Sequence, residues 1–180
     1  SRINKKIQNR TVLAAMTNKQ SYDNGIISND EIKWLLERAK GGFGIITTAA
    51  TNVSKEGKAW DGEFGVYDNS HIPSLTKLTS AIHQTKSLII AQLFHGGIKS
   101  PQKITGFIPI SASELDCQES SIGKSKKASE KDIKKIINDF TMSAIRCYEA
   151  GFDGIELHAA HGYLISQFLG KKTNLRNDNW

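Results

Sequence analysis

Two histidines and a tyrosine stand close together near the end of the sequence. The segment His158-Ala-Ala-His161-Gly-Tyr163 follows a short apolar run, so we expect these side chains just beyond a strand. Two imidazoles three residues apart can donate hydrogen bonds to one oxygen that gains negative charge, and a nearby phenol can supply a proton. The spacing also suits zinc, with His95 or Glu156 as a third ligand. A capped turn beside a core tyrosine is the plainer alternative.

The first predicted strand ends in Ala14-Ala15-Met16-Thr17, which holds few metal ligands. Because barrel metallohydrolases usually also draw ligands from early strands, we expect no metal site. Small side chains let the backbone approach a flat ring, and the Thr17 hydroxyl can donate to it. In the third predicted strand, Gln92 places an amide among apolar residues, where its donors and acceptor need partners. A neighbouring strand or a planar ligand such as a flavin pyrimidine ring can supply them.

Short apolar runs alternate with amphipathic segments along the chain. The runs predict strands at 11–16, 43–50, 88–94 and 152–158. Helices are predicted from a Ser28 cap to Gly41, over 73–86, from a Ser129 cap to Gly151, and over about 161–169. Segment 95–128 is the least regular and is predicted to hold at most one short hairpin; connections of this length are usually functional.

This βα alternation predicts a parallel sheet covered by helices. No G-x-G-x-x-G follows the first strand, which disfavours a dinucleotide-binding open sheet. Chemically capable side chains instead follow every strand, as an active site on the top face of a (β/α)8 barrel requires. These residues are Thr17, Thr51, His95, His158 and His161. The predicted fold class is therefore α/β: residues 1–180 form a single domain, the N-terminal half of a TIM barrel with about four βα units. A whole barrel needs roughly 250 residues, so we expect the remainder of the barrel to be absent.

The composition excludes several classes of protein. The 180 residues are 38% hydrophobic and 23% charged, an ordinary globular balance. The net charge of +6 comes largely from 2–10 and 124–135, where no aromatic residues interleave with the lysines, so we expect no nucleic-acid partner. No apolar run is long enough to cross a membrane. With no export signal evident, Cys117 and Cys147 are expected to be free thiols in the cytoplasm.

Four segments in order resemble the Old Yellow Enzyme family of FMN-dependent ene-reductases. They are NRTVLAAMT (9–17), GIITTAATNVSKEG (44–57), AQLFHGG (91–97) and GFDGIELHAAHGYLISQFL (151–169). Asn174, Arg176 and Asp178 also fit the N-x-R-x-D pattern of that family. The resemblance covers nearly the whole chain and is nearest to the compact bacterial branch, which carries a His–His pair.

The resemblance implies an oxidoreductase with FMN as cofactor and NADH or NADPH as reductant. Its substrate would be a small alkene activated by a carbonyl group, an enone or enal. Hydride would pass from the flavin to the β-carbon while Tyr163 protonates the α-carbon, and His158 and His161 would hold the carbonyl oxygen. The residues that the resemblance assigns to the flavin are Ala14, Ala15, Met16, Thr17, Ala50 and Gln92.

Lys19 stands where the compact branch often carries an aromatic substrate contact, so we expect a different substrate preference. The phosphate site of such barrels lies after strands seven and eight. Residues 1–180 alone are therefore expected to bind FMN weakly and to be inactive. Two alternatives stay open: a metal-dependent hydrolase using His158, His161 and His95, and a truncated, non-catalytic fragment. The sequence leaves the oligomeric state open, a homo-oligomer included.

Overall fold

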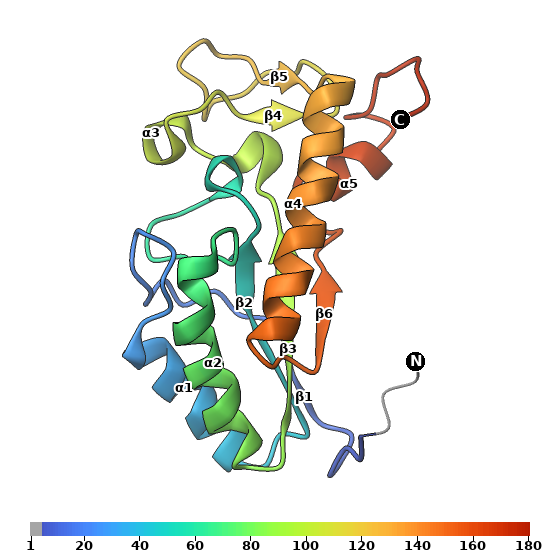
Figure 1. The fold of residues 1–180 in the computed structure, drawn as a ribbon. Helices are drawn as coiled ribbons and strands as arrows, with labels where there is room; N and C mark the ends of the chain where they lie inside the picture. The colour runs from blue at the N-terminus through green and yellow to red at the C-terminus, as the bar shows by residue number, and fades with distance from the viewer. Residues whose placement is uncertain (1–4) are drawn as a thin grey trace.

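A computed structural model describes residues 5–180, and its centre is a four-stranded parallel sheet in the order β1-β2-β3-β6 (Figure 1). The strands are β1 (Val12–Leu13), β2 (Ile45–Asn52), β3 (Leu88–Phe94) and β6 (Gly154–Leu157). Helices α1 (Asn29–Lys40), α2 (Ile72–His83) and α4 (Glu130–Glu149) connect them, and α5 (Leu164–Leu169) follows β6. The predicted βα repeat is confirmed.

The two helices with predicted serine caps, α1 and α4, begin where the sequence predicts. Ser28 Oγ accepts the Glu31 N–H at 3.1 Å at the start of α1. At the start of α4, Ser129 and Asp132 form a reciprocal capping box, in which each side chain accepts the backbone N–H of the other. These caps satisfy amides that have no partner within the helix, and therefore fix the first residue of each.

The predicted bounds differ from the structure most clearly at the first strand, at the second helix, which ends at His83 instead of 86, and at the last helix, which begins at Leu164 instead of about 161. The first strand has only two residues instead of 11–16, because its ladder to β2 contains only Val12–Ile45 and Leu13–Ile46. Residues 14–16 leave the sheet and become available as a loop at the end of the strand. Within 95–128, β4 (Ile110–Ser111) and β5 (Lys126–Lys127) form a parallel pair that the sequence does not predict, and the short predicted hairpin corresponds to the turn between them. The segment between them turns back at an antiparallel bridge from Asp116 to Lys124, and the short helix α3 (Gln102–Thr105) precedes both strands.

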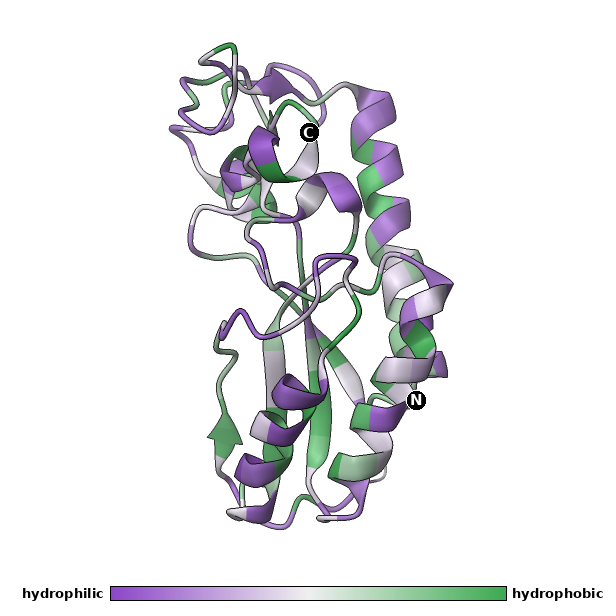
Figure 2. Cartoon of the chain, turned by 90° about the vertical axis from the view of Figure 1, so that its left-hand side faces the viewer, coloured by the Kyte–Doolittle hydropathy of each residue, from purple (hydrophilic) through white to green (hydrophobic). Residues whose placement is uncertain are grey.

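The main core lies between the sheet and α1, α2 and α4. It includes Ile46, Leu78, Ile82, Ile89 and Leu93, each with an exposed fraction of 0%. In Figure 2 the strands are mostly hydrophobic, whereas polar residues dominate much of the helical surface. A second cluster packs α4 and α5 beneath β4 and is made of Ile110, Ala128, Ile133, Ile136 and Leu164.

Strand β6 has no partner on its outer edge within residues 5–180. Its Ile155 and Leu157 are 41% and 53% exposed, and the neighbouring helix α4 exposes Ile137 and Tyr148. The sheet is therefore open on this side in the described part of the chain. No helix there is both long and apolar enough to cross a membrane.

Arg176 explains the N-x-R-x-D pattern in structural terms. Its side chain is only 3% exposed, and Nη1 donates to the Ala112 and Ala128 carbonyls at 2.9 and 2.6 Å. Asp178 accepts from Nε and Nη2 at 2.9 and 2.6 Å, which completes a forked ion pair. Arg176 thus ties both ends of the 112–128 segment to residues that follow α5.

Asp153 joins four parts of the chain at the amino end of the sheet. Its side chain is 1% exposed, and it pairs with Lys5 and, at 2.9 Å, with His83 Nε2. It also accepts the Ile89 N–H at 2.8 Å. Burial by itself raises the pKa of Asp153, but the hydrogen bonds from Lys5, Ile89 and His83 lower it below the ordinary value. The carboxylate form is therefore stabilised in the fold.

Replacing Asp153 with Ala is expected to lower the free energy of unfolding by about 2–4 kcal/mol, because the Ile89 amide loses a buried acceptor. Since the folded pKa is below the unfolded value of about 3.9, this stabilisation is complete above that pH and is lost as pH falls through the folded pKa. Urea titrations at several pH values between about 3 and about 7 measure both effects.

The matched control is Asp116→Ala, which removes the exposed pair with Lys124 and should change stability little. Equal losses in the two variants would show that Asp153 is not a structural hub.

Candidate active site

The sheet register brings three side chains into one row. Gln92 of β3 lies opposite Ala50 of β2 and opposite Glu156 of β6. Gln92 Nε2 donates to Glu156 Oε1 at 2.5 Å, and the Gln92 side chain is largely buried. Since the carboxyl ends of parallel strands meet at one edge of the sheet, the loops that follow these strands surround the row.

A cavity of about 630 Å³ opens at this end of the sheet, within the usual range for a small-molecule site. It brings together seven of the residues predicted for the site: Ala15, Thr17, Ala50, Gln92, His158, His161 and Tyr163. Three further predicted residues, Ala14, Met16 and Lys19, do not line it. Met16 is 46% exposed, and Lys19 is an exposed residue in a left-handed turn with φ +56°.

The two histidines contact each other directly. His161 Nδ1 lies 3.2 Å from His158 Nε2, and the His158 Nδ1 accepts the Ala160 N–H at 3.2 Å. Because Nδ1 of His158 is an acceptor, its neutral ring carries the proton on Nε2 and donates toward His161. An oxygen bound between the rings would accept from His158 Nε2–H and, after a change of tautomer or protonation, from His161 Nδ1–H.

Tyr163 lies against both histidines in an aromatic cluster. Its ring centroid is 4.9 Å from that of His158 and 5.1 Å from that of Phe94, which in turn stacks on Trp60 at 5.3 Å. Edge-on and stacked ring contacts of this kind are favourable and fix ring orientation.

The surroundings set the protonation states of His158 and Tyr163. Burial, followed by the nearby His161, lowers the pKa of His158, so the ring is neutral near pH 7. Burial, followed by the carboxylate of Glu63, raises the pKa of Tyr163 above its ordinary value. The phenol therefore keeps its proton at neutral pH, as a proton donor must.

His95 has a different place from the one that a metal site requires. It is fully buried, its Nδ1 accepts the Gly97 N–H at 3.0 Å, and burial, followed by Lys135, lowers its pKa to about 3. It does not line the cavity. Within residues 5–180 no group of three or more His, Cys, Asp or Glu side chains converges as metal ligands would. The arrangement of these side chains does not favour the hydrolase alternative.

The sequence does not assign five further residues of the cavity wall to binding: Trp60, Glu156, Leu157, Ala159 and Ala160. The sequence offers Glu156 only as a zinc ligand, although it stands two residues before His158 and therefore on the same face of the strand. Trp60 lies in the irregular segment after β2, and no local pattern distinguishes it there.

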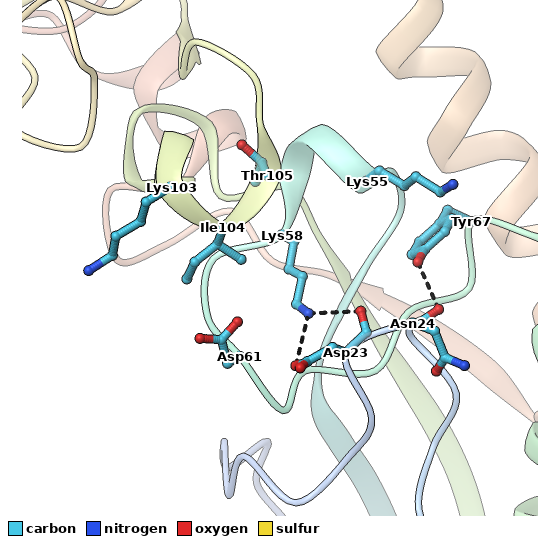
Figure 3. A pocket seen from close by; sticks show the side chains of 9 residues that line it. All are labelled: Asp23, Asn24, Lys55, Lys58, Asp61, Tyr67, Lys103, Ile104 and Thr105. Carbon is cyan, nitrogen blue, oxygen red and sulfur yellow. Dashed lines mark hydrogen bonds and ion pairs between the residues drawn. The ribbon is translucent and has the colours of Figure 1, made fainter.

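The loop that carries Trp60 is fastened on its other side, where a second hollow of about 750 Å³ lies (Figure 3). Lys58 Nζ donates to the Asp23 carbonyl at 3.0 Å and lies 3.6 Å from its carboxylate. Figure 3 shows Lys55 and Lys103 pointing away from each other, so the cations of this hollow do not converge. The contacts between Lys58 and Asp23 hold the Trp60 loop against the loop that follows β1.

Parallel βα units with a cavity at the carboxyl ends of the strands define an α/β protein of the barrel or doubly wound class. Comparison with known proteins identifies the family and, with it, the barrel. The model of the NADH:flavin oxidoreductase / NADH oxidase family matches residues 3–180. The chain belongs to this family.

Among relatives, the probable NADH-dependent flavin oxidoreductase YqiG of Bacillus subtilis is 37% identical; the match covers 97% of this chain and 46% of that protein. NADH:acrylate oxidoreductase of Vibrio harveyi is 35% identical, over 97% of this chain and 17% of that protein. NADPH dehydrogenase of Listeria monocytogenes is 36% identical, over 97% and 51% respectively.

The solved structures agree on the fold. The Old Yellow Enzyme homologue from Zymomonas mobilis superposes with a TM-score of 0.88 at 28% identity, covering 96% of this chain and 50% of that one. Morphinone reductase in complex with tetrahydroNAD gives 0.87 at 25% identity, covering 96% and 51%. The chain thus spans about half the length of most of these proteins. The prediction of an N-terminal half-barrel of the Old Yellow Enzyme type is confirmed.

The histidine geometry predicts how a phenol, whose oxygen imitates a negatively charged carbonyl oxygen, will bind. His158→Phe keeps an aromatic ring but removes the Nε2–H donor, so phenol affinity should fall about tenfold to a hundredfold. Calorimetric titration of the FMN-loaded protein with a nitrophenol measures this.

His161→Asn is the matched control, because asparagine keeps an N–H donor and tolerates the left-handed backbone at φ +54°. It should bind within a few-fold of the parent protein. Unchanged affinity in His158→Phe would contradict the donor role.

Proposed function

We propose that the complete protein is an FMN-dependent NAD(P)H oxidoreductase that reduces the activated C=C bond of small enones or enals. The carrying observation is the cavity in which His158, His161 and Tyr163 face Ala15, Ala50 and Gln92. In this proposal residues 1–180 act as one domain that supplies half of an FMN-binding barrel. Family membership supports the redox class, and the printed names of relatives include both NADH and NADPH enzymes.

The chemistry of the cavity wall fits a flavin ring. Ala15 and Ala50 are small enough to let a flat ring approach the strand ends, and Gln92 offers an amide donor and an acceptor side by side. Such a pair matches the alternating N–H and C=O groups of a pyrimidine ring. In the proposed site Ala15, Thr17, Ala50 and Gln92 line the space for the ring. Ala14 and Met16, which do not line the cavity, are proposed to contribute through the backbone of the same loop.

The flavin, when bound, supplies the hydride chemistry, and the protein supplies orientation and protons. His158 and His161 hold the substrate carbonyl oxygen and stabilise the negative charge that develops on it. Once His161 Nδ1 carries a proton, both rings can direct an N–H donor at the same oxygen, as in an oxyanion hole. Tyr163 then delivers its phenolic proton to the α-carbon, because its raised pKa keeps that proton in place at neutral pH.

Two names among the relatives support an alkene conjugated to a carboxyl-type carbonyl. One relative is an NADH:acrylate oxidoreductase, and a structure that superposes with a TM-score of 0.91 at 28% identity is a 2-naphthoyl-CoA reductase in complex with 2-naphthoyl-CoA. In both named compounds an unsaturated carbon is conjugated to a carbonyl. Lys19, which does not line the cavity, is proposed to contact the part of the substrate that extends out of it.

The location proposed for the protein is the cytoplasm. Cys117 and Cys147 are buried free thiols, as a reducing compartment favours.

Tyr163→Phe separates the two half-reactions. Removing the hydroxyl should slow alkene reduction about a hundredfold or more, because general acid catalysis is lost, while flavin reduction by NAD(P)H stays within about twofold. Because the pKa of Tyr163 is raised, alkene reduction in the parent protein should fall only as pH rises through that raised value. Stopped-flow absorbance at the flavin band follows each half-reaction.

The control is Tyr148→Phe, since Tyr148 is 83% exposed on α4 and outside the cavity. Equal slowing of both half-reactions in Tyr163→Phe would contradict the assignment of Tyr163 as the proton donor.

A further inference from the structure

The turn that presents the histidine pair has an unusual backbone. His161 and Gly162 have φ values of +54° and +69°, so two consecutive residues are left-handed, and the first of them is not glycine. A side chain other than glycine adopts this conformation only when the surroundings hold it. The contacts that hold the turn therefore decide where the His161 ring lies.

The two carbonyls of this turn accept hydrogen bonds from Lys99, in the segment after β3, and from Gln167 of α5. The His161 carbonyl accepts from Lys99 Nζ at 2.7 Å, and the Gly162 carbonyl accepts from Gln167 Nε2 at 2.7 Å. Gln167 is 1% exposed, and its Oε1 accepts the Ile98 N–H at 3.2 Å. The two fastenings thus meet at residues 98–99, which belong to a neighbouring loop.

Lys99 makes a second contact with the site. Its Nζ lies 5.4 Å from the centroid of the Tyr163 ring, within the range of a cation–π interaction. Among residues 5–180, Lys99 forms no ion pair with a carboxylate, so its charge is not neutralised locally. One ammonium group therefore touches the backbone of one site residue and faces the ring of another.

We propose that Lys99 is a positioning residue for the alkene-reducing half of the cycle, holding the His161 turn and orienting Tyr163. The inference rests on the proposed function and deepens it. Lys99 does not line the cavity, so it acts through His161 and Tyr163 and does not touch the substrate. The buried amide of Gln167 holds the same turn through the Gly162 carbonyl. We call the Lys99 and Gln167 contacts together the clamp of the turn.

The test compares Lys99→Met, Lys99→Arg and Lys103→Met in the complete, FMN-loaded protein. Lys99 is exposed, so its loss leaves the core intact, and the exposed Lys103 on α3 provides a matched control for the loss of one charge. Lys99→Met should weaken nitrophenol binding about fivefold to tenfold and slow alkene reduction by a similar factor. Flavin reduction by NAD(P)H should be unchanged, and Lys99→Arg should restore most of the loss.

Hydrogen exchange provides a readout that does not depend on turnover. The Tyr163 N–H donates to the Ala160 carbonyl at 3.1 Å within the clamped turn, so its exchange should become faster in Lys99→Met and not in Lys103→Met. Unchanged exchange together with unchanged nitrophenol affinity would overturn the proposal. So would equal slowing of both half-reactions, since the proposal assigns Lys99 to the alkene-reducing half of the cycle.

Failure of the proposed function has a different signature. If the parent protein bound no FMN and reduced no alkene, the proposed function and the alkene-reducing role of Lys99 would fall together, while the exchange experiment would still decide whether Lys99 holds the turn. If the parent protein reduced alkenes and Lys99→Met matched it in every measurement, only the role of Lys99 would fail.

Discussion

Two backbone hydrogen bonds to the end of β3 bracket the segment that carries the histidine pair and the tyrosine. The His158 N–H donates to the Leu93 carbonyl at 2.9 Å, and the Leu164 N–H donates to the His95 carbonyl at 3.0 Å. The first is the last rung of the β3–β6 ladder, and the second ties the start of α5 to the loop after β3. The positions of His158, His161 and Tyr163 in the cavity depend on these two bonds, because the bonds fix both ends of a seven-residue segment whose interior is an irregular turn.

The loop after β2 packs directly against the loop after β3. The Gly96 N–H donates to the Gly57 carbonyl at 2.8 Å, and a Cβ at Gly57 would lie 2.7 Å from the His95 ring. Glycine at position 57 therefore permits the loop after β2 to approach the loop after β3. His95, which the sequence offers as a metal ligand, instead fills the space beneath this approach as a neutral buried ring. The Trp60 wall of the cavity thus has its place because of packing around His95.

The sequence predicts what depends on local periodicity and capping. The four strands and the helices that follow them come from apolar runs and from the Ser28 and Ser129 caps, and Gln92 is correctly expected to lie among strand residues. The short β1 is not predictable in this way, because the chain leaves the sheet after Leu13 although β2 continues to Asn52, and local periodicity does not mark that departure. The parallel β4–β5 pair is also not predictable from local periodicity, since its register comes from contacts between segments that are distant in the chain.

Site prediction from the sequence has a similar boundary. Residues within strands or directly after them, such as Gln92 and His158, follow from alternation and strand ends, whereas Trp60 and Lys99 lie in loops whose course is set by other loops. The roles of Trp60 and Lys99 become evident only from the three-dimensional structure, because the partner that positions each one is more than thirty residues away in the chain.

The open edge of β6 connects stability with the site. Ile155 and Leu157 alternate with Glu156 along this strand, so the strand that exposes apolar side chains also supplies the carboxylate partner of Gln92. Burying a side chain such as leucine contributes about 1.5–3 kcal/mol, so covering this edge would stabilise the sheet and exclude water from the row of site residues at once. Relatives of about twice this length have the additional chain to cover it. Under the proposed function, exclusion of water from this row would favour hydride transfer from the flavin, and we therefore expect cofactor binding and closure of this edge to be energetically coupled.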